Sequence, residues 1–380
     1  MSFTTVCFTG IFYWVIAHII LSLTRNDKIT IKINSCSKCS FYRFQLVLAF
    51  IILCVFSTFR LVTSDGTGGT DAYTYILNFL SVTPQEFFKS ITLDNIFHKT
   101  TFEPLYTLLA LAVRQITSDY HVFFAVAYGF ISFSIILCLK TFIVKNQNGY
   151  IPLLYFIYLL LITFNILRTG LAVSWVLLAI VKLSKNKNLS AVLCVAIGIL
   201  FHYSTVVFLL FLFLYFIFRK NIWEHIFIKT IVCLAACYFL SMISRSFIAE
   251  TSYSGYLRDF DEVSIWGRLP IVLLWLCVLL LHKQLKEKLQ GNTLLILCCM
   301  FDFVALPFNF ISFWRMQYYF LIPRLFMWNE LVDIVDQQYL KNDVTRVIFK
   351  ILVYALFFSW FIFRLYRSDG SNLVPYQFSF

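Results

Sequence analysis

Apolar runs recur along the whole chain and are separated by short polar stretches. Most runs contain about 17 to 23 residues, which is enough for a helix to cross a hydrocarbon core of ~30 Å. A helix also satisfies its own backbone hydrogen bonds, as a segment surrounded by lipid must. The pattern therefore predicts an all-α fold, a polytopic transmembrane helical bundle that forms a single integral membrane domain over residues 1–380.

The basic residues orient the predicted spans, because Lys and Arg collect in cytoplasmic loops. The run at residues 3–23 is followed by a loop rich in Lys and Arg, and a second run at 44–61 then crosses to the outer face. Later spans are expected at about 226–245, 266–282, 293–311, 316–334 and 345–363. Together with the apolar runs in between, these segments predict about 12 crossings.

One segment in the first half of the chain is predicted not to cross. Arg43 and Lys182 both belong in cytoplasmic loops, yet five apolar segments lie between them, and an odd number of crossings cannot join two loops on one side. Residues 102–115 are short and are expected to form a re-entrant segment, which protein or a water-filled cavity must cover. Residues 189–218 are predicted to form a tight pair of helices whose outer tip is residues 201–204.

The longest polar stretch, residues 60–103, follows the second predicted span directly. Within it, residues 62–101 contain more acidic than basic side chains, which predicts a periplasmic loop. A second acid-rich stretch at residues 246–265 is predicted to form another periplasmic loop. Any chemistry of the chain is therefore expected at the outer face.

Composition narrows the class of protein further. Hydrophobic residues make up 60% of the chain and charged residues 13%, so the net charge of +12 is attributed to cytoplasmic loops and not to a nucleic-acid surface. The chain has no P-loop, dinucleotide fingerprint, HExxH or GxSxG motif. Its CxxC, from Cys36 to Cys39, has no second pair at metal-binding spacing. We therefore expect no nucleic-acid partner, no metal site and no cofactor.

Several ionisable residues lie in or beside the apolar runs near the predicted outer face. Such a residue costs roughly 2.5–3.5 kcal/mol to insert and often serves a function, although any single one can instead be a side chain that snorkels to the interface. Arginines near one surface with few carboxylates suit an anionic group such as a lipid diphosphate. The candidates for substrate binding are Arg60, Tyr75, Arg114, Arg315 and Arg324. The candidates for catalysis are Asp71, Glu103, Arg168 and His202.

Short motifs in a fixed order give the chain a likeness to a known family. They are Arg60 followed by Gly69-Thr70-Asp71 and Tyr75, Phe102-Glu103-Pro104, Arg168 ahead of Leu171-Ala172, Phe201-His202-Tyr203-Ser204, and Asn372-Leu373-Val374-Pro375-Tyr376. In these motifs, which span nearly the whole chain, the sequence resembles the EpsG-type family of Wzy-like O-antigen and exopolysaccharide polymerases.

The resemblance implies a multi-pass enzyme of the bacterial cell inner membrane whose active site faces the periplasm. Such an enzyme joins oligosaccharide repeat units carried on undecaprenyl diphosphate, and its product is O-antigen, capsule or exopolysaccharide. Similar polymerases are metal-independent, inverting glycosyltransferases related in architecture to C-type membrane glycosyltransferases. The implied partners are the lipid-linked oligosaccharides, with a flippase and a chain-length regulator as further candidates.

The candidate residues fit this chemistry in more than one way. Arg168 is expected, with Arg315 or Arg60, to stabilise the charge on the departing diphosphate. Asp71, Glu103 and His202 are all candidates for the base that deprotonates the acceptor hydroxyl. Glu103 is favoured, because an acid in a covered re-entrant segment is expected to have a raised pKa.

Two other functions remain open from the sequence. A lipid-linked oligosaccharide flippase or transporter would also place arginines in a polar cavity, although the chain shows no internal repeat. An integral-membrane acyltransferase that modifies surface glycans would need a catalytic histidine beside another polar group deep in the membrane.

Overall fold

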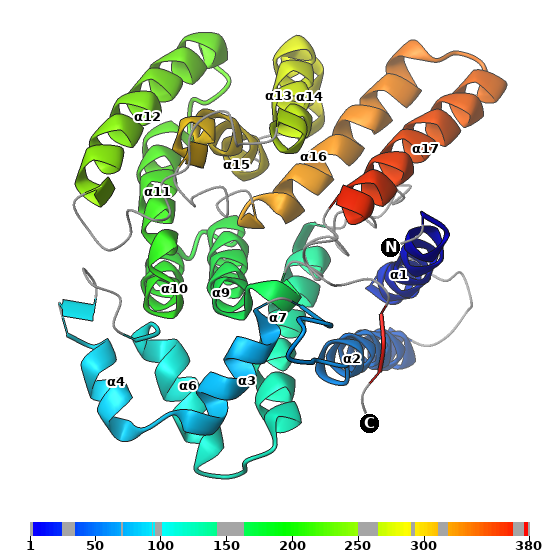
Figure 1. Ribbon diagram of the computed structural model, residues 1–380. Coiled ribbons are helices and arrows are strands. Elements are labelled where there is room, and N and C mark those ends of the chain that lie inside the picture. Colours follow the sequence, from blue (N-terminus) through cyan, green and yellow to red (C-terminus); the bar gives the residue numbers. More distant parts are fainter. Residues whose placement is uncertain are drawn as a thin grey trace.

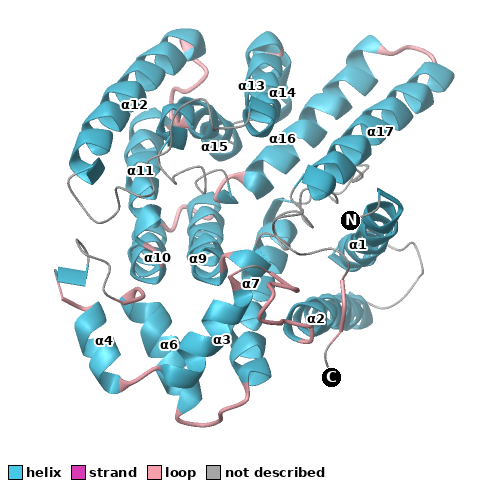
Figure 2. Cartoon of the chain, viewed as in Figure 1, coloured by secondary structure: helices cyan, strands magenta, loops and turns pink. Residues whose placement is uncertain are grey.

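The regular elements of the chain are helices throughout the part that the structure describes (Figure 1). This computed structural model describes residues 3–24, 35–69, 71–92, 94–95, 101–142, 163–249, 265–289, 293–310, 318–367 and 376–378. Figure 2 shows no strand in these ranges, and an isolated bridge between Arg60 and Phe378 is the only extended pairing they contain. The prediction of an all-α fold is confirmed.

Several helices are suited to crossing a membrane. In the described ranges, five are long and apolar enough by length and composition, namely α1 (Phe3–Thr24), α7 (Tyr120–Phe142), α9 (Leu167–Ser184), most of α12 (Ile226–Ala249) and most of α17 (Asp343–Arg367). A sixth span results if α13 (Ile265–Leu280) and α14 (His282–Leu289), which are bent by 82°, count as one. The membrane-type bundle is confirmed, whereas the count of about 12 crossings is not.

Shorter helices occupy the re-entrant segment and several of the other apolar segments that the sequence predicted. They are α6 (Pro104–Arg114), α10 (Asn188–Phe201), α11 (Val207–Phe218), α15 (Thr293–Val304) and α16 (Leu321–Ile334). With 11 to 14 residues each, they extend only about 17–21 Å. The helix α2 (Ser35–Thr58) has 24 residues, but its apolar part begins only at Arg43. Hydropathy locates these segments, and it overestimates the helical length of α15, which ends at Val304 although the predicted span ran to residue 311.

The predicted periplasmic loop at 62–101 is partly helical. It contains α3 (Ala72–Ser81) and α4 (Pro84–Ser90). The first turn of α4 is fixed by a capping box, in which Thr83 and Glu86 each accept a hydrogen bond from the other's backbone N–H. Figure 1 shows α3, α4 and α6 gathered at one end of the bundle, where α6 also packs against α10.

The helices α9 and α10 form the centre of this arrangement. A tight turn at 185–187 joins them, and Asn186 adopts a left-handed conformation there (φ 55°). The parts of α9 nearest to Gly198 of α10 are the Ala172 carbonyl and the Trp175 side chain, each 3.4 Å from the place of a Cβ on this glycine. Of the apolar window of α9, 78% is buried, against 17% for α17 at the edge. The start of α9 and the end of α10 therefore meet at one end of the bundle.

The predicted helix pair at 189–218 is found, with its break at His202. A short 3-10 turn, η1 (Tyr203–Val206), separates α10 from α11. Tyr215 near the end of α11 and Lys185 at the end of α9 line the same cavity, so α11 leads back toward the α9–α10 turn. Most of the second predicted periplasmic loop, residues 250–264, lies outside the described ranges.

Candidate active site

Glu103 stands where the polar stretch enters α6. It is the residue before the helix, its backbone is extended (φ −65°, ψ 151°), and Pro104 opens the first turn. Its side chain does not cap the helix, so the carboxylate is available to other elements. Only 5% of the residue is exposed, which makes partners for its charge necessary.

Two basic side chains supply those partners. Arg168, in the first turn of α9, donates from Nη1 to the Oε2 atom of Glu103. His202, at the end of α10, places Nδ1 2.7 Å from the Oε1 atom of Glu103. All three side chains are at least 85% buried. These residues, here called the Glu103 cluster (Glu103, Arg168 and His202), bring together three of the four predicted catalytic residues from segments 65 and 99 positions apart.

The electrostatics of the Glu103 cluster differ from the sequence-based expectation. Burial raises the pKa of Glu103, but the charge on Arg168 and the hydrogen bond with His202 outweigh burial and hold this pKa well below its usual range. The expected raised pKa is therefore wrong, and Glu103 is ionised at neutral pH. An ionised carboxylate of low pKa is a weak base, but it is well suited to orienting its two partners.

An aromatic wall lies against the arginine. The guanidinium carbon of Arg168 is 4.3 Å from the centre of the Phe102 ring, and Tyr75 forms a side-chain hydrogen bond with Arg168. The ring of Tyr75 packs 5.8 Å from that of Tyr106, which is fully buried. Tyr75, which the sequence predicted to bind substrate, therefore contacts the Glu103 cluster through Arg168.

Two buried polar groups, one in the Glu103 cluster and one beside it, have no hydrogen-bond partner among the described residues. They are Nε of Arg168 and the hydroxyl of Tyr106. A buried donor without an acceptor costs about 1–3 kcal/mol, so such groups usually bind water or a ligand. Tyr106 was not singled out from the sequence, although its position three residues after Glu103 places it on the same side of α6.

The backbone of His202 is held firmly in place. Its N–H donates to the Gly198 carbonyl at 3.0 Å, and its carbonyl accepts from the Thr205 N–H at 3.0 Å. The Thr205 hydroxyl in turn lies 2.9 Å from the hydroxyl of Tyr319, which ties this tip to the segment before α16. With Nδ1 hydrogen-bonded to Glu103, the lone pair of the neutral ring is on Nε2.

Asp71 and Arg114 are not brought into the cluster. Asp71 precedes α3, and its side chain is exposed, whereas Tyr75 one turn later is buried. Arg114 lies at the far end of α6, about 16 Å along the helix from its start. Its donors reach the Leu80 carbonyl and the Ser118 hydroxyl.

Arg60 is buried in the wall of the bundle, with 1% exposure. Its guanidinium donates to the carbonyls of Ser57 and Gly68 and to the hydroxyl of Tyr128, and it stacks 4.4 Å from the ring of Phe164. These bonds fix the polar loop, here defined as residues 59–69, against the segment that leads into α9. The structure therefore places Arg60 as a support for the cluster's surroundings and not within the cluster.

The C-terminal segment closes over the same loop. The Leu61 N–H donates to the Gln377 carbonyl at 2.8 Å, and the Tyr376 hydroxyl donates to the Phe56 carbonyl. The rings of Tyr376 and Phe56 stack with centres 4.5 Å apart. The segment 376–378 thus acts as a strap across the end of α2.

Arg324 is paired inside the bundle. It makes two hydrogen bonds to Asp302, of 2.7 and 2.9 Å, that join α16 to α15. Asp302 was overlooked in the sequence, although an acid within the apolar run 293–304 was a usable signal. Arg315, the remaining predicted binding residue, lies outside the described ranges. In those ranges no three His, Cys, Asp or Glu side chains gather closely enough to hold a metal ion.

Comparison with protein families gives one match that covers most of the chain. The model of the EpsG family matches residues 43–378, a range that contains the whole Glu103 cluster, the polar loop and the strap. No curated protein and no solved structure matches the chain.

Proposed function

Because the chain belongs to the EpsG family, we propose that it is a membrane glycosyltransferase that polymerises oligosaccharide repeat units carried on undecaprenyl diphosphate. The observation that carries this proposal is the Glu103 cluster, in which a carboxylate, a guanidinium and an imidazole meet at one end of an apolar helical bundle. Such a group provides a cation for a leaving diphosphate and a base for a sugar hydroxyl.

The proposed reaction is a single displacement at the anomeric carbon of the growing glycan. The bond from that carbon to the diphosphate oxygen breaks with both electrons leaving on the diphosphate. The acceptor hydroxyl of an incoming lipid-linked unit forms the new glycosidic bond and loses its proton to a base. One displacement inverts the anomeric configuration, and the products are the extended lipid-linked glycan and undecaprenyl diphosphate.

Arg168 is proposed to stabilise the departing diphosphate. One of its nitrogens is bound to Glu103, while its buried Nε has no partner in the described structure. A guanidinium offers five donors in a planar fork, so the remaining ones can bind phosphate oxygens. In this proposal the positive charge comes from the side chain itself, and the reaction proceeds without a metal ion.

His202 is proposed as the base, with Glu103 as its positioning residue. The hydrogen bond from Nδ1 to Glu103 leaves Nε2 to accept the proton of the acceptor hydroxyl. Glu103 then stabilises the imidazolium that forms, as a carboxylate behind a histidine does in other enzymes. The low pKa of Glu103 favours this division of roles over direct proton abstraction by Glu103.

The proposed setting is the bacterial inner membrane, with the Glu103 cluster facing the periplasm. Lys182, Lys185 and Lys187 gather at the opposite end of the α9–α10 pair, and basic residues favour the cytoplasmic side. In this orientation the substrates arrive after a flippase has delivered them, and a chain-length regulator would act on the product at the same face.

Complementation of a polymerase-deleted strain tests this function. The strain receives wild type, Arg168→Ala, His202→Gln or, as a control for loss of charge, Arg219→Ala at the turn after α11. Removal of one charge-stabilising donor costs on the order of 10²–10³ in rate, so Arg168→Ala should leave glycans of one repeat unit while Arg219→Ala keeps the long ladder. Equal membrane levels of each variant are verified by immunoblot.

The glycan pattern also separates the competing functions. Loss of a flippase leaves no surface repeat unit, and loss of an acyltransferase leaves a ladder of full length. A full ladder from equal amounts of Arg168→Ala protein would overturn the polymerase assignment of this residue.

A further inference from the structure

Tyr106 is a fully buried tyrosine of α6 that follows Glu103 by three residues. Its ring packs against Tyr75 of α3 and Phe123 of α7, with ring centres 5.8 and 6.0 Å away. The Phe102 ring meets it edge-on, with the two centres 5.3 Å apart. These contacts hold the ring in place without giving its hydroxyl a hydrogen-bond partner among the described residues.

The position of this hydroxyl is unfavourable for packing alone. A phenylalanine would make the same ring contacts without the free-energy cost of burying a polar oxygen. The phenol interacts electrostatically with Arg168 and with Glu103, so it lies beside the Glu103 cluster. A buried donor at such a place indicates that an acceptor is supplied from outside the described residues.

A second donor lies close to the first. Nε of Arg168 is also buried without a hydrogen-bond partner in the described structure. The two residues share two neighbours. The Phe102 ring lies 4.3 Å from the guanidinium carbon of Arg168 and contacts Tyr106, while Tyr75 packs on Tyr106 and forms a side-chain hydrogen bond with Arg168. Because Nε of an arginine can only donate and a phenol can donate as well, one acceptor oxygen can satisfy both groups.

The Phe102 ring covers the two donors in the structure. Phe102 is partly exposed and belongs to the non-helical residues just before α6, so its side chain can rotate without breaking the hydrogen bonds of a helix. The adjoining cluster is not sealed, because the side chains of Arg168 and His202 are 12% and 15% exposed. An oxygen that approaches along Arg168 therefore meets Tyr106 once the Phe102 ring has moved.

We propose that Tyr106 is a further substrate-binding residue, whose hydroxyl donates a hydrogen bond to an oxygen of the departing diphosphate that also accepts from Nε of Arg168. The inference rests on the polymerase function proposed above and adds a neutral donor to its positive charge. The diphosphate gains negative charge as its bond to the anomeric carbon breaks, so both hydrogen bonds strengthen in the transition state. No proton is transferred to or from Tyr106.

Thermal unfolding of the purified full-length protein in detergent, over a series of undecaprenyl diphosphate concentrations, tests the proposal. Tyr106→Phe removes only the hydroxyl oxygen. Without ligand, its Tm should equal or exceed that of wild type, because the lost group has no partner in the protein. With ligand, the Kd obtained from the rise in Tm should be roughly 10- to 150-fold higher than for wild type, which corresponds to one hydrogen bond to a charged group.

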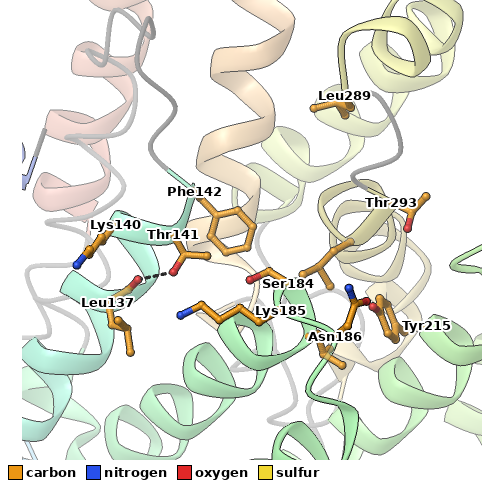
Figure 3. Close-up of a pocket in the computed structure, with 12 residues that line it drawn as sticks. Leu137, Lys140, Thr141, Phe142, Ser184, Lys185, Asn186, Tyr215, Leu289 and Thr293 are labelled. Atoms are coloured by element: carbon orange, nitrogen blue, oxygen red, sulfur yellow. Dashed lines mark hydrogen bonds between the residues drawn. The ribbon is translucent and has the colours of Figure 1, made fainter. Parts of the chain in front are cut away.

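Tyr215→Phe provides the matched control, because Tyr215 of α11 is also a buried tyrosine but lies at the other end of the bundle. There it borders the lysine-lined cavity, here defined as the cavity of about 880 Å³ whose lining includes Lys140, Lys185 and Tyr215 (Figure 3). Lys185 follows Arg168 by 17 residues along α9, a separation of about 26 Å. The Kd of Tyr215→Phe should therefore equal that of wild type.

The outcomes separate this inference from the function on which it rests. Wild type that is not stabilised by undecaprenyl diphosphate would contradict the polymerase proposal and the role of Tyr106 together. Stabilisation of wild type and Tyr106→Phe with the same Kd would overturn the role of Tyr106 alone. A lower Tm of Tyr106→Phe without ligand, or an equal loss of affinity in Tyr215→Phe, would also overturn that role.

Discussion

The carboxylate of Glu103 faces two basic side chains, Arg168 and His202, in a largely buried setting. The carboxylate and the basic side chains each offset the free-energy cost of burying the other, so removal of any one side chain leaves a buried group without its partner. The cluster is therefore expected to behave as a unit in stability as well as in catalysis.

The stability that Glu103 contributes should depend on pH in a defined window. Its folded pKa is lowered, and the unfolded carboxyl titrates near ~4.3, so below that pH the unfolded state binds a proton that the folded state does not. The contribution is thus complete above about pH 5 and lost progressively below it. The difference in Tm between wild type and Glu103→Gln should stay constant down to that pH and then narrow. A difference that widens in acid would contradict this account.

A double-mutant cycle should reveal the coupling between Glu103 and Arg168. Glu103→Gln leaves a buried guanidinium unpaired, which costs about 3–5 kcal/mol. The double variant Glu103→Gln/Arg168→Met removes both charges, so its loss in unfolding free energy should be smaller than the sum of the single losses by ~0.5–3 kcal/mol. Unfolding is followed in detergent with each variant under the same conditions. Strict additivity would show that the two side chains do not interact.

The sequence identified these residues better than it identified their partners. An ionisable side chain within an apolar run is visible in the sequence, and Glu103, Arg168 and His202 were found in this way. Their pairings span 65 and 99 positions, and no local pattern encodes them. Arg60 and Arg324 were identified for the same reason. In the structure, however, Arg60 donates to main-chain carbonyls such as that of Gly68, and Arg324 donates to Asp302. A buried charge indicates that a partner exists without indicating which group it is.

The ends of helices, more than their centres, determine where these side chains lie. Arg168 begins α9, His202 ends α10, and Glu103 precedes α6. The sequence predicted most helices, because apolar periodicity is strong over a helix. It did not give every length, since a 3-10 turn such as η4 (Leu306–Phe310) interrupts an apolar run without a change in hydropathy.

Gly69 in the polar loop should not tolerate a side chain. Its φ is 128°, and a Cβ would lie 2.8 Å from the Asn165 side chain and 2.9 Å from the Phe164 carbonyl. Gly69→Ala should therefore destabilise the fold by more than about 1 kcal/mol and shift the segment that leads to Arg168. Gly129→Ala is the control, because a Cβ there meets its nearest atoms only at 3.8 Å. Thermal unfolding compares the two, and equal Tm values would contradict the loop geometry.

The pair of Asp302 and Arg324 should be replaceable by apolar residues. Arg324→Met alone leaves the Asp302 carboxylate buried without its cation and should cost about 3–5 kcal/mol. Asp302→Leu/Arg324→Met removes both charges and should recover most of the Tm. Recovery of the long glycan ladder by the double variant would assign Arg324 a structural role. A stable double variant without a ladder would instead support the predicted contact with substrate.

The molecule as a whole is a bundle with two chemically different ends. One end carries the Glu103 cluster beside α3, α4 and α6, and the other end carries the lysine-lined cavity. The sequence predicted that the two ends differ, because its Lys and Arg residues collect in loops assigned to one side of the membrane. The bent and short helices that enclose each end depend on packing between distant segments, which single-sequence hydropathy does not contain.

Cysteine labelling should establish the direction of the bundle. Gln115→Cys lies at an exposed position between α6 and α7, and Lys187→Cys lies at an exposed position in the α9–α10 turn. A membrane-impermeant maleimide added to spheroplasts should label Gln115→Cys at once and Lys187→Cys only after permeabilisation. Wild type gives the background from its native cysteines. The reverse order of labelling would place the Glu103 cluster at the cytoplasmic face.

The strap at 376–378 has a consequence for the biosynthesis of the chain. Tyr376 donates to the Phe56 carbonyl across 320 positions, and Gln377 accepts from Leu61. A ribosome must therefore translate the chain through Gln377 before these bonds can form. Until then, the polar loop and Arg60 lie in a wall that lacks the segment 376–378. This wall is completed only when residues 376–378 arrive, and a nascent chain that stalls shortly before Tyr376 leaves it open.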